Sequence, residues 1–442
     1  MKELTKGYPA KVIMMFALPL MAGFIFQQLY NICDSKIVST YVSTDAFAAI
    51  GATGVVSNTL IGFINGLTQG FAIPVANCFG ASDFRKMKKN IAGSIVLTAI
   101  VTVILTALSL IFIEDILMLL RTPTEIMPYA TAYVKIILAG IVLTAIYNLC
   151  ANILRAVGDS KTPLYCLLIG VVFNIVLDIL FVKGFGWKIQ GAAYATLVAQ
   201  AVSGILCLLY IIKRFKDIIP EKESFDFEWD LYKNLITTGL SMGLMSCIVN
   251  IGTIVLQGAI NSLGKDIVAA HTAARRVFDI LTVVLYTVGI AMTTFVSQNI
   301  GAGKMDRVRQ GVRHAIVIVT IETTVLMILC FALGRIVLMW ITSTDNTYII
   351  DSAVMYSRVS IMFFYILGPL FILRCTLQGL GRKVIPVLSS VLEMVVKVVS
   401  ASLLVPVFGY VGVAFTEPVS WIFMTILLTV AYVAGLKKQD KM

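Results

Sequence analysis

Two acidic residues lie inside long apolar stretches of this sequence, where an ionised side chain costs several kcal/mol. Asp34 ends the segment QQLYNICD, and Asp178 lies in FNIVLDIL. Tyr30 precedes Asp34 by one helical turn and Asn174 precedes Asp178 by the same spacing, so each pair shares a helix face. Two carboxylates in a low-dielectric pocket cannot both stay ionised cheaply. We therefore expect them to share a proton, bind a cation such as Na⁺, or find a basic partner, with coupled titration.

Thr196 lies near the start of the next apolar stretch, at a depth similar to that of the two acids. A hydroxyl, a phenol and an amide oxygen beside two carboxyl groups suit either a Na⁺ shell or a proton network. A static hydrogen-bonded network that only holds helices together is the alternative. The predicted coupling-ion site consists of Tyr30, Asp34, Asn174, Asp178 and Thr196.

A second polar set occurs in the C-terminal half of the chain. Glu393 and Lys397 are one turn apart, and Glu417 follows in the next apolar stretch. A buried Lys–Glu pair that holds two helices together fits this pattern, and so does a second proton or substrate site. Arg276 and Asp279, three residues apart, are predicted to form a structural ion pair.

The composition places these residues in membrane-spanning helices. Of the 442 residues, 59% are hydrophobic and 13% are charged, against about 45–50% and about 25% in soluble domains. Lipid is the solvent that this excess indicates, and the long continuous apolar runs favour helices over barrel strands. Twelve spans are predicted, at 12–37, 46–77, 91–113, 129–155, 163–183, 190–212, 234–262, 267–298, 314–340, 351–375, 384–407 and 410–435.

The lysines and arginines in the loops and near the ends of these spans are distributed unequally. On the side of the two termini there are 22 of them, and on the opposite side there are six. Because cytoplasmic loops carry the excess of basic residues, both termini are predicted to be cytoplasmic, in the inner membrane of a prokaryote. This bias and contact with anionic lipid explain the net charge of +11, so no nucleic-acid partner is expected.

The two halves of the chain repeat each other. FGASDFRKM (79–87) aligns with IGAGKMDRV (300–308), and RAVGDSKTP (155–163) aligns with QGLGRKVIP (378–386). The match runs in the same direction, so a parallel duplication is predicted. The expected fold is an all-α polytopic membrane protein of two pseudo-symmetric six-helix bundles. Its predicted parts are an N-terminal lobe (1–212), a cytoplasmic linker (213–233) and a C-terminal lobe (234–442).

The repeat is broken at the acidic positions. By this alignment Asp34 corresponds to Val255 and Asp178 to Ala401, while Asn174 corresponds to Lys397. The acid pair is therefore expected in the first lobe alone.

Other polar and conformational signals are weaker. Pro19 removes a backbone hydrogen bond from the first span and should kink it, as a moving hinge or as a fixed bend. No phosphate loop, Ser–His–Asp set or paired cysteines are visible, so neither an enzyme nor a resident metal or cofactor is expected. Substrate contacts or interhelical hydrogen bonds are predicted for Gln27, Gln28, Asn148, Asn152 and Gln257.

Several segments resemble the multidrug and toxic compound extrusion (MATE) family over nearly the whole chain. They are QQLYNICD, TDAFAAIGA, FGASDFRKM with its copy IGAGKMDRV, and RAVGDSKTP. The resemblance implies twelve helices in two six-helix bundles with an outward-opening central cleft, and antiport of drugs against H⁺ or Na⁺. The acid cluster is similar to that of the DinF-like branch, because the span-7 glutamate of the NorM-like branch has no counterpart in GLSMGLMSCIVN. Ser39 and Ser43 stand where the family usually has glycines.

The predicted function is therefore a secondary active antiporter that exports organic, often cationic, drugs or toxins in exchange for H⁺ or Na⁺ by alternating access. The alternative within the same superfamily is a flippase for a lipid-linked precursor, which would favour a basic cavity and often two further spans. No catalytic constellation supports a membrane-embedded enzyme, and a channel would leave the acid cluster and the asymmetry of the lobes unexplained. The expected partners are a small organic substrate and the lipid bilayer, with the protein acting as a monomer.

Overall fold

The computed structural model describes residues 3–120, 122–342, 344 and 346–439. Ten helices in this part of the chain are long and apolar enough to cross a membrane, and two bent helix pairs bring the number to twelve if each pair is one span. The predicted all-helical membrane fold is confirmed, with ten to twelve candidate spans.

The helices follow one another in the order of the predicted spans, with ends that differ by several residues. The first repeat contains α1 (Pro9–Tyr41), α2 (Thr44–Gly80), α3 (Phe84–Leu119), α4 (Met127–Ala139), α5 (Ile141–Ala156), α6 (Lys161–Asp178), the π-helix η1 (Ile179–Gly184) and α7 (Lys188–Arg214). Two short 3-10 helices come next, η2 (Lys216–Ile218) and η3 (Lys222–Phe225). The second repeat contains α8 (Trp229–Asn261), α9 (Lys265–Gly301), α10 (Met305–Thr342), α11 (Thr347–Met362), α12 (Phe364–Gly379), α13 (Val384–Phe408) and α14 (Tyr410–Gln439).

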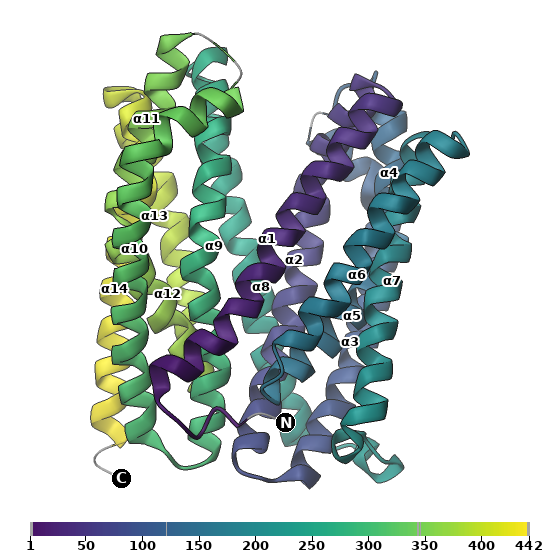
Figure 1. Ribbon diagram of the computed structural model, residues 1–442, viewed down its shortest axis with the longest axis vertical. Coiled ribbons are helices and arrows are strands. Elements are labelled where there is room, and N and C mark those ends of the chain that lie inside the picture. The colour runs from purple at the N-terminus through teal and green to yellow at the C-terminus, as the bar shows by residue number, and fades with distance from the viewer. Residues whose placement is uncertain (1–2, 121, 343, 345, 440–442) are drawn as a thin grey trace. The chain divides into compact units, whose positions relative to one another are not determined.

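The chain folds into two compact units that do not coincide with the two repeats. Unit 1 contains Pro19–Gly243, and unit 2 contains Leu4–Leu18 together with the described residues from Leu244 onward. The chain passes between the units inside α1 and inside α8. The first part of α1 therefore belongs to unit 2, which is built mainly from the second repeat. The first part of α8 belongs to unit 1, which is built mainly from the first repeat. Within unit 2, α9, α10, α12, α13 and α14 run side by side (Figure 1).

The predicted linker, 213–233, lies within unit 1. Its helices η2 and η3 contact α3, and Lys88 and Lys89 of α3 form ion pairs with Glu221 and Glu228. The ammonium group of Lys88 holds the pKa of the Glu221 carboxyl below its usual range. The boundary between the packed units lies inside α1 and α8 and not in this segment.

The duplication is visible in the irregular features of the helices. The predicted spans 129–155 and 351–375 are each bent, by 44° and 51°. The breaks fall at Gly140 and Phe363, which are 223 residues apart. Gly158 and Gly381, also 223 residues apart, both have positive φ, 86° and 73°. Glycine adopts this conformation without a steric penalty, so both copies keep it at the same turn.

Helices α2 and α8 cross closely in unit 1 through glycines spaced four residues apart on both helices. A Cβ on Gly66 would meet the backbone oxygen of Met242 at 2.5 Å, and a Cβ on Gly70 would meet Cα of Gly239 at 2.7 Å. Small residues with this spacing let two membrane helices approach to backbone contact. The crossing fixes the first part of α8 in unit 1, where Leu235 packs in the same apolar core as α2.

Candidate functional site

Helices α1, α6 and α7 of unit 1 bring the five predicted coupling residues together. Asp34 of α1 is 7% exposed, and Asn174 and Asp178 of α6 are fully buried. The carboxyl groups of Asp34 and Asp178 face each other. The phenol of Tyr30 interacts with the Thr196 hydroxyl of α7, which donates a hydrogen bond of 3.0 Å to a backbone carbonyl one turn earlier. The structure therefore forms the predicted cluster, and its role in coupling stays a prediction.

The backbone changes its helical form at one of the two acids. Asp178 is the last residue of α6, and the chain continues directly as the π-helix η1. The N–H of Phe185 donates to the carbonyl of Leu180, five residues earlier, at 2.8 Å. π-helices are rare and frequently occur at functional sites. The wider turn thus starts at the residue that the coupling hypothesis depends on.

Apart from the contact between the two facing carboxyl groups, five buried polar atoms of this cluster make no hydrogen bond with the described residues. They are Oδ1 of Asp34, both carboxyl oxygens of Asp178, and both polar atoms of the Asn174 amide. A buried polar group left without a partner costs about 1–3 kcal/mol, and more if it is charged. The donor set of carboxyl, amide and hydroxyl oxygens is of the kind that hard cations prefer. The cluster can therefore hold a shared proton or a small cation.

Sequence reasoning missed a second phenol at this cluster. Tyr133 of α4 is 9% exposed and lies within electrostatic range of Asp34, Tyr30 and Asp178. A tyrosine in an apolar run carries no distinctive signal, and its place in the cluster depends on how α4 packs.

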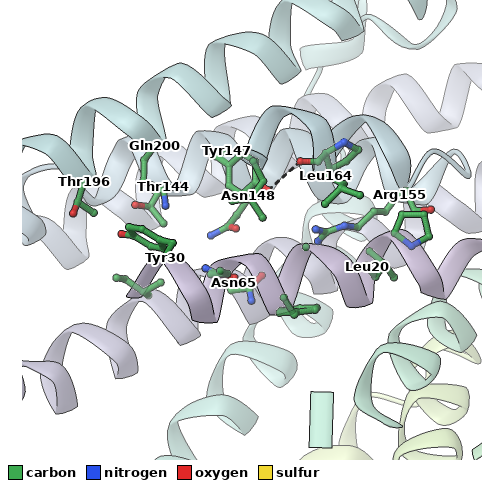
Figure 2. A pocket seen from close by; sticks show the side chains of 18 of the residues that line it. Leu20, Tyr30, Asn65, Thr144, Tyr147, Asn148, Arg155, Leu164, Thr196 and Gln200 are labelled. Carbon is green, nitrogen blue, oxygen red and sulfur yellow. Dashed lines mark hydrogen bonds between the residues drawn. The ribbon is translucent and has the colours of Figure 1, made fainter. Parts of the chain in front are cut away.

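A pocket of about 190 Å³ lies beside the cluster, and all of its lining residues belong to unit 1 (Figure 2). Tyr30 and Thr196 belong to both the cluster and the pocket wall. Pro19, where α1 enters unit 1, also lines the pocket. The pocket is smaller than the roughly 300–1,000 Å³ of sites for drug-sized ligands. It therefore suits a small ligand or one end of a larger one.

The predicted substrate-contact residues occupy different places. Gln27 and Asn148 line the pocket, whereas Gln28 and Asn152 are not among its lining residues. The Asn152 amide donates to the Thr68 hydroxyl and accepts from Arg155, both at 3.0 Å. The bond to Thr68 joins α5 to α2, so Asn152 makes the interhelical hydrogen bond that was the alternative to substrate contact. In unit 2, Gln257 donates to the Asn261 side chain at 2.9 Å.

The second polar set lies in unit 2 and is larger than predicted. Glu417 of α14 accepts hydrogen bonds on both carboxyl oxygens from Nη1 of Arg275, at 3.0 Å. Its carboxylate also lies 3.4 Å from Nζ of Lys397. The Tyr356 hydroxyl donates to it at 3.3 Å. The structure thus brings the predicted neighbours Lys397 and Glu417 together. It also places Arg275 of α9 against Glu417, a contact that the sequence pattern had not indicated.

The remaining members continue this set on both sides. Glu393 pairs with Lys397 at 2.9 Å and with Arg374 of α12 at 3.3 Å. At the other end Arg275 pairs with Asp279 at 3.0 Å. The predicted Arg276–Asp279 pair is wrong, because the spacing of four residues, and not of three, places the charged groups together here. We call this set the charge network: Arg275, Asp279, Arg374, Glu393, Lys397 and Glu417.

Comparison with known proteins gives one family and several relatives. The family model described as MatE matches residues 19–180 and 242–403. The chain is 29% identical over 306 residues to the probable multidrug resistance protein YpnP of Bacillus subtilis, covering 69% of this chain and 68% of the relative. It is 26% identical to the probable multidrug resistance protein YoeA of the same organism, covering 85% and 82%. A solved outward-facing multidrug resistance MATE family transporter of the MOP superfamily superposes with a TM-score of 0.92 at 23% identity, over 99% of this chain and 98% of that one.

Proposed function

The chain belongs to the MatE family of membrane transporters, and from this we propose that it exports organic compounds in exchange for H⁺ or Na⁺ bound at Asp34 and Asp178. It is a multi-pass membrane protein and a multidrug efflux transporter of this family, with bacterial relatives named for multidrug resistance. The finer parts of the proposal are the coupling ion, the DinF-like site, cytoplasmic termini and action as a monomer. The coupling ion and the cytoplasmic termini are proposed from the sequence patterns, and the DinF-like site is proposed from the family resemblance.

The observation that carries the coupling proposal is the pair of buried carboxyl groups with unpartnered oxygens on two helices. Two unit charges 4 Å apart repel by about 4 kcal/mol at an effective dielectric constant of 20. A proton or Na⁺ between Asp34 and Asp178 removes this repulsion and draws α1 and α6 together. Release of the cation restores the repulsion, so occupancy of the site and the position of α1 are linked.

Helix α1 is suited to transmit that change. It contains Pro19 at the point where the chain passes from unit 2 into unit 1. Proline removes one backbone hydrogen bond from a helix and weakens it at that turn. The proposed hinge therefore coincides with the border of the packed units, and the same residue lines the pocket beside the cluster.

The proposed substrate contacts are Gln27 and Asn148 in this pocket. They share its wall with Tyr30 and Thr196 of the cluster, so a bound substrate and the coupling cation act on the same helices. Antiport by alternating access follows if the protein changes orientation when it holds either the cation or the substrate, and not both. Cationic drugs remain proposed substrates through the family resemblance.

The test is export from proteoliposomes driven separately by a pH gradient and by a Na⁺ gradient, with ethidium and ciprofloxacin as fluorescent drugs. Asp34→Asn and Asp178→Asn should reduce gradient-driven export to the level of protein-free vesicles, because neither variant can bind the cation between two carboxylates. Asp45→Asn, which changes an exposed acid of the same unit, should behave as the wild type. Full gradient-driven export by the two cluster variants would refute the coupling role.

A further inference from the structure

The pocket of unit 1 has one charged side chain in its wall, and that charge is positive. Arg155, in the last turn of α5, lines the pocket, and none of the described lining residues is acidic. The two acids of the coupling cluster are not among the lining residues. A pocket in a low-dielectric surrounding with an uncompensated guanidinium favours an anionic ligand group.

The hydrogen-bonding capacity of Arg155 is only partly used. Its Nη1 donates to Oδ1 of Asn152 at 3.0 Å, and its buried Nε has no partner among the described residues. Figure 2 shows the guanidinium directed along the pocket towards Asn148 and Asn65. Donors therefore remain for a ligand that enters from the pocket side.

The acid nearest to Arg155 in the sequence is engaged elsewhere. Oδ1 of Asp159 accepts from the backbone N–H groups of Lys161 and Thr162 at 3.1 and 3.0 Å. Its Oδ2 accepts from the Thr162 hydroxyl at 2.7 Å. The Asp159 carboxylate is thus engaged by donors of Lys161 and Thr162 at the start of α6.

The rest of the pocket wall is amphipathic. Gln27, Asn65 and Asn148 provide neutral amides, and Phe24 and Leu164 provide apolar surface. A single arginine matches a monoanion, and its planar fork fits a carboxylate with two parallel hydrogen bonds. The volume of about 190 Å³ admits one end of a drug-sized molecule.

We propose that Arg155 binds the carboxylate of the transported compound, so that the pocket selects amphipathic acids and zwitterions over the corresponding esters and amides. This rests on the proposed function for its role in export, but the binding preference exists without any gradient. Arg155 is then the specificity-determining residue of the substrate pocket. The contrasting role, in which Arg155 only stabilises the end of α5, predicts no such preference.

Three fluorescent probes that differ in one group test this: dansylglycine, dansylglycinamide and dansylated ethanolamine phosphate. Binding to the purified full-length protein in detergent is followed by dansyl fluorescence. The wild type should bind dansylglycine about tenfold more tightly than the amide, a difference of about 1.4 kcal/mol. Tighter binding of the phosphate probe than of dansylglycine would assign the site to phosphate compounds and overturn the carboxylate claim.

Arg155→Gln should remove the preference for dansylglycine, while Arg214→Gln, an exposed arginine at the end of α7, should keep it. The comparison of acid and amide on the wild type needs no variant, so it holds even if Arg155→Gln folds poorly. Equal affinity of the wild type for acid and amide would refute the inference. Because this assay uses no ion gradient, such a result leaves the coupling role of Asp34 and Asp178 untouched, and loss of coupling leaves the binding preference untouched.

Discussion

Two buried asparagines of unit 1 illustrate how single residues divide between function and stability. Asn174 is fully buried, and both polar atoms of its amide lack a partner among the described residues. Asn152 is equally buried, but its amide donates to Thr68 and accepts from Arg155. An unpartnered buried amide costs free energy, whereas a satisfied one contributes to holding helices together. The buried amide of Asn174 therefore costs stability, and its place in the proposed coupling site would account for that cost.

Replacing each asparagine by leucine, which has a similar volume, should change stability in opposite directions. Asn174→Leu should raise the thermal unfolding temperature of the purified protein, because it removes an unsatisfied group worth about 1–3 kcal/mol. Asn152→Leu should lower it, and Asn174→Leu should also reduce gradient-driven export. Thermal unfolding in detergent measures both. If Asn174→Leu proves as destabilising as Asn152→Leu, the amide of Asn174 has a partner and the argument for its role fails.

At the scale of helices, the crossing of α2 and α8 is set by four glycines, Gly66, Gly70, Gly239 and Gly243. Gly70→Val should prevent the crossing, because a side chain there would collide with the backbone of α8 at less than 3 Å. The yield of monodisperse protein and its unfolding temperature should both fall. Gly51→Val, on the same helix with nothing within 4 Å of the added carbon, is the control. Equal behaviour of the two variants would mean that α2 and α8 do not pack in this way.

The helices themselves were predictable because apolar length is the signal of a membrane span. Their bends at Gly140 and Phe363 were not, since a bend leaves hydropathy unchanged. Neither was the passage of α1 and α8 between the packed units, because the order of the chain does not determine the bundle in which each end of a helix packs.

The candidate site was predictable in part, for a similar physical reason. Asp34 and Asp178 are conspicuous because ionisable groups are expensive inside a membrane. Arg155 was overlooked because a basic residue at the end of a span is explained by the excess of positive charge in cytoplasmic loops. The Arg275–Glu417 contact joins helices that are distant in sequence, and only their packing reveals it.

For the whole molecule, the two repeats place side chains of different charge at equivalent positions. Asn174 and Asp178 of the first repeat correspond to Lys397 and Ala401 of the second. In unit 1 the acids have unpartnered oxygens. In unit 2 the charge network balances three acids with three basic groups, so each carboxylate already has a cation beside it. Because these carboxylates are already neutralised, the charge network is not expected to bind a further cation. Breaking one of its buried pairs should cost stability.

The coupled cation should therefore depend on unit 1 and not on unit 2. The most direct test is the flux of H⁺ or radioactive Na⁺ that a concentration gradient of the transported drug drives across proteoliposomes, expressed per drug molecule moved. The wild type should show an opposing cation flux. Asp178→Asn should show none, and Glu417→Gln should keep the wild-type ratio even if less folded protein is recovered. An unchanged ratio in Asp178→Asn, or its loss in Glu417→Gln, would contradict the assignment of coupling to the acid pair of unit 1.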